Sequence, residues 1–222
     1  GLFRMNADGS NIQTLVTPTN PQEADQDLNA VTYSPDGARI FYQRWLADSI
    51  QLWVMNADGT DQHPVTDIFD VEFGSYQSDV SPNGKTIVFN RSREFDPPTI
   101  WTIDVDGGNL TALTELGPHA DLDPQWSPNG KEIVFSSNRG DTFEIYLMNA
   151  NGAGVAPLTA SAGGDFNPTF SPDGRQIAWW KQRFGSGDIW VMNRDGSGQV
   201  NVTNSPEFEG FPAWQHGHLV QK

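Results

Sequence analysis

Acidic side chains recur at one place in a repeated pattern of this sequence. The tetrapeptides that begin at Asp121 and Asp165 both run from an acidic residue to an apolar residue, then to Asp or Asn, then to Pro. Similar segments begin at Asp27, Ser75 and Glu209, although the first of these needs one extra residue afterwards to keep the spacing. If the repeats form a ring, each such position becomes a ring of side chains around one axis. The carboxylates expected there are those of Asp27, Asp121, Asp123, Asp165 and Glu209.

A ring of carboxylates needs something to offset its charge. Converging carboxylates repel one another unless they are hydrated, partly protonated or bridged by a cation. Oxygen ligands in this number suit Ca²⁺ or Mg²⁺ more than a transition metal. The sequence therefore predicts a Ca²⁺ or Mg²⁺ site at the mouth of a central channel. The alternative interpretation, which stays open at this point, is that these carboxylates cap turns and face water.

Catalytic chemistry has less support in the sequence. A glycosidase needs two or three carboxylates about 5–10 Å apart, which Asp121, Asp165 and Glu209 would supply if the ring formed a pocket. The chain has no cysteine, and its 4 histidines show no paired metal-ligand spacing. It also lacks a Gly-x-Ser-x-Gly elbow, a phosphate loop and a dinucleotide fingerprint. These absences exclude the enzyme classes built on those motifs and favour a non-catalytic role.

Composition excludes further classes of function. The chain has 28 Asp and Glu against 13 Lys and Arg, a formal net charge of −15, which would repel the phosphate backbone of nucleic acids. No run approaches the roughly 20 consecutive apolar residues of a membrane-spanning helix. The chain contains 13 Phe, 8 Trp and 4 Tyr but only 36% hydrophobic residues, which predicts an aromatic, β-rich core.

Two turn signatures alternate along the chain and define the elements that position these residues. The first is Ser-Pro-Asp-Gly or Ser-Pro-Asn-Gly, and its copies begin at Ser34, Ser81, Ser127 and Ser171, with a degenerate fifth copy after Trp214. The second resembles Met-Asn-x-Asp-Gly, with its glycine at Gly9, Gly59, Gly107, Gly152 and Gly196. Pro presets φ, Asp or Asn tolerates the turn, and Gly supplies a positive φ, so both signatures predict hairpin turns. Apolar alternation flanks the turns, which predicts four antiparallel strands in each unit of about 44 residues.

Five such units predict an all-β fold, a five-bladed β-propeller with four-stranded antiparallel blades. Radial closure of this kind hides the edges of the sheets. We expect blades at approximately 18–66, 67–114, 115–159 and 160–203, and a last blade made of 204–222 together with 1–17. The ring is thus expected to close through a blade shared between the two termini, with residues 1–222 as a single propeller. The first strand of every blade would line the central channel.

The repeat resembles that of the TolB-like family of WD-like β-propellers. The clearest unit runs Pro124-Gln125-Trp126-Ser127-Pro128-Asn129-Gly130, then Ile133-Val134-Phe135-Ser136-Ser137-Asn138-Arg139, then Ile145-Tyr146-Leu147-Met148-Asn149. The resemblance covers essentially the whole chain. It implies a bacterial protein of the periplasm, or a secreted one, that holds protein or peptide partners, and it implies that channel cations occur in relatives. Similar repeats also occur in peptidases, beside a separate catalytic domain, and in polysaccharide-degrading enzymes.

Departures from the repeat are the expected partner-binding surfaces, because the repeated residues are occupied with building the blade. The segment from Asp67 to Tyr76 is long and aromatic, and it contributes Phe73 and Tyr76 as candidates. Trp179 and Trp180 are adjacent, so strand alternation places one in the core and leaves Trp180 as a third candidate. Such aromatics could grip a peptide or stack on sugar rings, whereas packing between blades is the alternative interpretation.

Taken together, these patterns favour a monomeric, non-catalytic recognition propeller. Its partner would be a protein or peptide at the channel mouth or on the top loops, and the overall negative charge would steer a cationic partner there. The runner-up is a propeller that binds or cleaves carbohydrate, as a lectin, glycosidase or lyase. A third hypothesis is that the propeller was excised from a larger protein.

Overall fold

The computed structural model of this protein describes residues 1–17, 28–46, 49–66, 77–92, 96–183 and 186–214. Across these ranges the secondary structure consists of strands, and no helix long and apolar enough to cross a membrane is present. The strands are β1 (Leu2–Arg4), β2 (Gln13–Val16), β3 (Leu28–Tyr33), β4 (Arg39–Leu46), β5 (Ser49–Asn56), β6 (His63–Pro64), β7 (Ser78–Val80), β8 (Thr86–Arg91), β9 (Thr99–Asp104), β10 (Thr111–Ala112), β11 (Asp121–Trp126), β12 (Glu132–Ser137), β13 (Glu144–Asn149), β14 (Ala156–Pro157), β15 (Asp165–Phe170), β16 (Gln176–Arg183), β17 (Ser186–Asn193) and β18 (Val200–Asn201).

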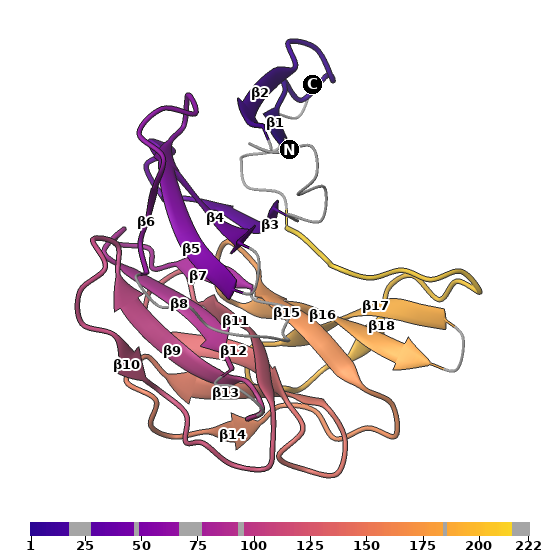
Figure 1. Ribbon diagram of the computed structural model, residues 1–222. Helices are drawn as coiled ribbons and strands as arrows, with labels where there is room; N and C mark the ends of the chain where they lie inside the picture. The colour runs from indigo at the N-terminus through magenta and orange to yellow at the C-terminus, as the bar shows by residue number, and fades with distance from the viewer. Residues whose placement is uncertain (18–27, 47–48, 67–76, 93–95, 184–185, 215–222) are drawn as a thin grey trace.

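The strands form five antiparallel sheets that follow one another around a common centre (Figure 1). Four sheets have four strands each, in chain order: β3 to β6, β7 to β10, β11 to β14 and β15 to β18. The N-terminal sheet pairs β1 with β2. This arrangement confirms the predicted all-β propeller with five repeated units. The eight residues that follow Trp214, on which the predicted closing strand depends, lie outside the described ranges.

The Ser-Pro-Asp-Gly turns form as their residue types require. The N–H of Gly37 donates to the carbonyl of Ser34 at 2.8 Å, and Gly37 has a φ of 69° that a side chain would resist. The Ser34 hydroxyl donates to the Asp36 carboxylate at 2.6 Å and accepts the Arg39 N–H at 2.9 Å. The same contacts recur in the next three blades, so one local device sets the first hairpin of each four-stranded sheet.

A threonine after each fourth strand ties that strand back to the third. In the sheet of β11 to β14, the N–H of Ile145 donates to the Thr159 hydroxyl at 2.9 Å. Equivalent bonds are made by Thr66, Thr114 and Thr203. The outer strands have only two residues each, so this side-chain bond extends a pairing that the backbone alone makes short.

A bulge interrupts the first strand of three blades, β3, β11 and β15. The pairing of β11 with β12 shifts register between Leu122 and Gln125, and Asp123 there has a φ of 54°. The matching positions with positive φ are Ala30, Asn167 and Phe211. A bulge changes the direction of the side chains on either side of it. One short strand can therefore pair within its blade and also line the channel.

Adjacent sheets pack face to face through apolar side chains. One cluster joins Val88 and Ile100 to Trp126 in the next sheet. The following cluster includes Trp179, which is fully buried, whereas Trp180 is half-buried on the other face of β16. The predicted division of the two tryptophans between core and surface is therefore confirmed.

Candidate functional site

The first strands surround a cavity of about 310 Å³. Its described walls come from five segments, which are 31–32, 77–79, 124–125, 167–169 and 211–214. The last segment follows β18 and carries the same bulge position, Phe211, as the first strands of the other blades. Residues 211–214 therefore occupy the fifth place in the channel wall. The cavity has the concave form and the size, at the lower end of roughly 300–1,000 Å³, of small-ligand pockets.

Hydrogen bonds across the cavity wall join the second blade to the third, the third to the fourth, and the fourth to the segment after β18. Asp79 accepts the N–H of Trp126 through Oδ2 at 2.8 Å. One blade further on, Gln125 accepts the N–H of Phe170 through Oε1 at 2.7 Å. The Trp214 indole N–H then donates to the carbonyl of Thr169 at 3.1 Å. We call these three contacts the blade-to-blade bonds.

Asp79 is the one ionisable residue among the described residues that line the cavity. Its removal from bulk water raises the pKa of its carboxyl to about 7, although the N–H groups of Trp126 and Val80 act in the opposite direction. Of the described wall residues, Asp79 is thus the one whose carboxyl group changes charge near neutral pH.

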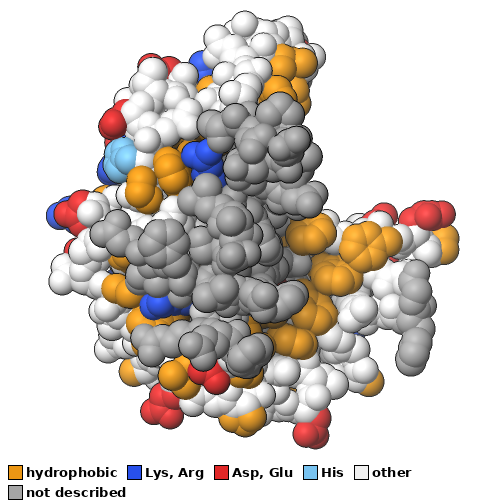
Figure 2. Space-filling model, in the orientation of Figure 1, with side chains coloured by type: hydrophobic (Ala, Val, Ile, Leu, Met, Phe, Trp, Pro, Cys, Tyr) orange, Lys and Arg blue, Asp and Glu red, His pale blue; other side chains and the backbone are white. Residues whose placement is uncertain are grey.

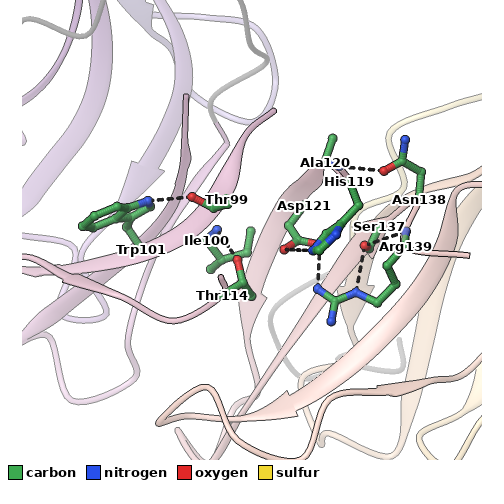
Figure 3. Close-up of polar contacts among 10 residues, drawn as sticks. All are labelled: Thr99, Ile100, Trp101, Thr114, His119, Ala120, Asp121, Ser137, Asn138 and Arg139. Atoms are coloured by element: carbon green, nitrogen blue, oxygen red, sulfur yellow. Dashed lines mark hydrogen bonds and ion pairs between the residues drawn. The ribbon is translucent and has the colours of Figure 1, made fainter. Parts of the chain in front are cut away.

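The predicted acidic residues make contacts both within a blade and between neighbouring blades. Asp121 is fully buried, accepts a hydrogen bond from Arg139 Nη2 at 2.8 Å, and lies 3.8 Å from His119 Nε2 (Figure 3). The same guanidinium donates to the hydroxyl of Ser137 at 3.0 Å. Asp123 is also buried and accepts the N–H of Asn167 at 3.3 Å.

Asp165 is fully buried and accepts a hydrogen bond from the Ser161 hydroxyl at 3.2 Å. Burial raises the pKa of its carboxyl to about 6, and the nearby Glu144 carboxylate adds to this rise, while Thr159 and Lys181 oppose it. Asp165 and Glu144 therefore form a buried carboxyl pair rather than two groups facing a pocket. Glu209 is half-buried, and its Oε2 has no hydrogen-bond partner in the described part of the chain.

The predicted metal ligands are not brought together in the described ranges. No group of three or more His, Asp or Glu residues there could hold a metal ion. Asp27 lies outside these ranges. In the third blade Asp121 pairs with Ser137 at the end of the second strand, and in the first blade the residue at the equivalent position is Leu28, which pairs with Arg44. The segment at Asp27 thus needs no extra residue, because strand pairing aligns Leu28 with Asp121. A channel cation stays a prediction.

Each four-stranded sheet places a cation over the aromatic residue of its third strand. Arg139 lies 5.1 Å from the centre of the Tyr146 ring, and Lys181 lies 4.9 Å from that of Trp190. The first two blades repeat this arrangement with Arg44 over Trp53 at 4.8 Å and Arg91 over Trp101 at 5.0 Å. Sequence reasoning missed these pairs, although a cation near the end of each second strand was a usable signal. Each cation–π pair contributes about 0.5–2 kcal/mol of interaction energy within its blade.

Five aromatic side chains make a continuous surface beside the cavity. Trp180 is its centre, with the ring centres of Phe166 and Phe208 both at 5.2 Å and that of Phe211 at 6.4 Å. Phe143 extends the group from Phe166 at 4.9 Å. We call these five residues the aromatic surface. Figure 2 shows hydrophobic side chains, in orange, over the region of β15, β16 and the segment after β18.

The segment after β18 is held in place by Gly187. The N–H of Glu209 donates to the carbonyl of Gly187 at 2.9 Å, and Phe208 forms a bridge with Gly187. Trp180 lies directly over this glycine, so a Cβ at position 187 would overlap its indole nitrogen. The contact brings Phe208 and Phe211 beside Trp180, with exposed fractions of 58% and 67%.

The structure treats the three predicted partner-binding residues differently. Trp180 lies at the centre of the aromatic surface, whereas Phe73 and Tyr76 lie outside the described residues. Phe143, Phe166, Phe208 and Phe211 were missed. Phe166 follows Asp165 by one residue, and Phe208 and Phe211 lie within two residues of Glu209. This proximity to the repeated acidic positions was the signal available in the sequence.

Comparison with known proteins agrees with this architecture. A family model described as TolB beta propeller domain matches residues 98–217. The uncharacterized protein Atu1656 of Agrobacterium fabrum is 29% identical over 143 residues, which cover 60% of this chain and 46% of that protein. The uncharacterized peptidase YuxL of Bacillus subtilis is 33% identical over 136 residues, which cover 59% of this chain and 19% of that protein. The chain spans less than half the length of these curated relatives.

Solved structures show the same fold. TolB from Acinetobacter baumannii has a TM-score of 0.75 and 19% identity, with 90% of this chain and 47% of that chain covered. An oligogalacturonate lyase in complex with manganese has a TM-score of 0.67 and 14% identity, with 90% and 58% covered. These identities show the fold alone, whereas the family model covers more than half of the chain. The chain therefore belongs to the TolB β-propeller family.

Proposed function

We propose that this propeller is a non-catalytic recognition module that binds a protein or peptide segment on the aromatic surface. The observation that carries the proposal is the exposure of Phe208 and Phe211, at 58% and 67%, on rings that pack against Trp180. Contiguous exposed aromatic surface is costly in water and marks interaction sites. Phe211 also lines the cavity, so a bound segment would lie next to the channel.

The arrangement of carboxylates supports binding rather than hydrolysis. A glycosidase needs two carboxyl groups that reach one substrate, about 5–10 Å apart. Here Asp121 is held by Arg139, and Asp165 shares a buried site with Glu144, which is only 6% exposed. The described cavity wall offers Asp79 alone.

The carbohydrate alternative has one observation in its favour, the exposed ring faces of Phe208 and Phe211. Against it, the Trp180 ring is contacted by three phenylalanines, so its faces are used within the cluster. The lyase of similar fold adds no weight, because that likeness concerns the fold. The two alternatives differ in their response to salt. Binding of a basic peptide by an acidic protein weakens as salt is added, whereas stacking of sugars on aromatic rings does not.

The proposal includes a bacterial periplasmic setting, which membership in the TolB propeller family supports. A Ca²⁺ or Mg²⁺ ion at the mouth of the central channel is a separate proposal. Thermal unfolding of the EDTA-treated protein tests it, because an ion that binds the folded state alone at a hundredfold excess over its Kd adds about 2.7 kcal/mol. An unchanged Tm at millimolar Ca²⁺ and Mg²⁺ would reject it.

Binding to peptide and glycan arrays tests the main proposal. We expect the protein to bind a subset of basic peptides, with signals that fall as salt rises from 50 to about 300 mM. Phe208→Ser should abolish those signals, because it removes an exposed ring of the aromatic surface.

Ile12→Ser is the matched control, because Ile12 is 67% exposed in the loop between β1 and β2, outside the aromatic surface. Its signals should equal those of the unmodified protein. Salt-tolerant glycan signals lost in Phe208→Ser would replace the proposal with the carbohydrate alternative. Peptide signals that survive Phe208→Ser would reject the aromatic surface as the binding site.

A further inference from the structure

We propose that the cavity beside the aromatic surface receives a lysine or arginine side chain of the bound partner, with the Asp79 carboxylate as its counter-ion. The inference rests on the proposed function, since the aromatic surface holds the partner next to the cavity. It adds the chemistry of the side chain that enters.

The negative charge of Asp79 is not needed to hold the blades together. Asp79 and Gln125 occupy equivalent positions, and each accepts the N–H of the first-strand residue in the next blade, at 2.8 and 2.7 Å. The neutral amide of Gln125 therefore makes the blade-to-blade bond as well as a carboxylate does. A charge that is costly to bury and that the fold does not need points to a ligand.

Among the described residues that line the cavity, Asp79 has no charged neighbour. The described groups that share the cavity with it are Val31 and Thr32 from β3, Gln77 and Ser78 beside it, Pro124 and Gln125 from β11, Asn167, Pro168 and Thr169 from β15, and 211–214. All of these side chains are neutral, and the two groups that lower the pKa of Asp79 are backbone N–H groups. Ser78 adds a buried hydroxyl that has no hydrogen-bond partner in the described ranges.

A basic side chain fits this cavity better than a neutral or acidic one. The net charge of −15 attracts cations to the protein as a whole. Inside the cavity the cation would meet the carboxylate of Asp79, and the polar residues Thr32 and Asn167 also line the wall. Phe211 lines the same cavity, and the face of an aromatic ring attracts a cation.

Binding of a cation should be linked to loss of a proton. The carboxyl of Asp79 has its pKa raised to about 7, so a cation favours its ionised form and displaces the proton. From pH 6 to pH 8 the ionised fraction of such a group rises about tenfold. The affinity for a basic side chain should rise by about the same factor.

Isothermal titration calorimetry with butylguanidinium and butylammonium tests the inference on the full chain. These probes reproduce the ends of arginine and lysine side chains, and 1-pentanol serves as the neutral probe. We expect saturable binding of at least one cation at pH 8, about tenfold weaker binding at pH 6, and no binding of 1-pentanol.

Asp79→Asn should weaken cation binding at least tenfold and remove its pH dependence. Asp173→Asn is the matched control, because Asp173 lies in an exposed turn whose equivalents in two other blades are Asn83 and Asn129. The control should bind cations as the unmodified protein does. Cation binding that is absent at pH 8, equal in Asp79→Asn, or matched by 1-pentanol would overturn the inference.

The two proposals fail in different ways. Basic peptides that bind the aromatic surface and are lost in Phe208→Ser, but not in Asp79→Asn, would keep the proposed function and reject the counter-ion. Small cations that need Asp79, in a protein that binds no peptide, would keep the cation site and reject the recognition function.

Discussion

Two neighbouring junctions between blades perform the same structural task with different chemistry. At the first, the carboxylate of Asp79 accepts the N–H of Trp126, and at the second the amide of Gln125 accepts the N–H of Phe170. Both acceptors line the cavity. The difference shows that the junction requires an acceptor oxygen but no charge. The charge of Asp79 therefore costs desolvation energy without being needed for the junction, and we propose that it serves to bind a cation.

The largest effect is expected from Gln125→Leu, which removes the acceptor at the second junction. The Phe170 N–H would lose its partner, and an unsatisfied backbone donor away from water costs about 1–3 kcal/mol. We expect the free energy of unfolding in urea to fall by about 2 kcal/mol, with little dependence on pH.

Gln199→Leu provides the comparison for that change. Gln199 also bonds the backbone, but as a donor to two carbonyls at 3.2 and 3.1 Å on the exposed surface, where water can replace it. Equal losses in the two variants would show that the junction bond has no special weight.

Asp79→Asn tests the cost of the charge at the first junction. The folded pKa of about 7 lies well above the pKa of about 3.9 of an unfolded aspartate, so the folded state binds the proton more tightly than the unfolded state does. The stability that this provides is present below about pH 4 and is lost as pH rises through 7. At pH 8 the variant should be more stable by about 2 kcal/mol, after allowance for the partial exposure of Asp79.

Urea unfolding between pH 4 and pH 9 measures this effect. At pH 4 the variant and the unmodified protein should be almost equally stable, because Asp79 is then protonated when folded. If the variant is instead less stable at pH 8, the ionised carboxylate must stabilise the junction beyond the hydrogen bond that it accepts from Trp126, which would contradict the prediction.

The smallest expected effect is that of Gln125→Glu, which gives the second junction the chemistry of the first. The new carboxyl would keep the acceptor for Phe170, and partial burial would raise its pKa. We expect a loss of about 1 kcal/mol at pH 8 and almost none at pH 4. Stability that is lowered equally at both pH values would point to a packing defect instead of a charge.

Much of the fold could be predicted from the sequence. The turn at Ser34 to Gly37 and its three equivalents depend on residues within a few positions of each other, and their hydrogen bonds form as expected. The alternation that buries Trp179 and leaves Trp180 half-buried is also local to one strand.

The predicted site was less accessible to sequence reasoning. Sequence alone allowed an extra residue after Asp27, but strand pairing places Leu28, not Asp27, in register with Asp121. Asp79 did not stand out, because the equivalent positions in the following blades hold Gln125 and Thr169 and so form no acidic pattern.

The sequence by itself determined the repeated four-stranded unit, its hairpin turns and the surplus of acidic residues, because these depend on neighbours in the chain and on composition. Only the tertiary structure decided that Phe143 and Phe166 meet Trp180 and the segment after β18 on one surface. It also decided that Asp79 is the carboxyl whose pKa reaches about 7. Desolvation and ring packing depend on which distant segments surround a side chain, and ring closure sets those neighbours.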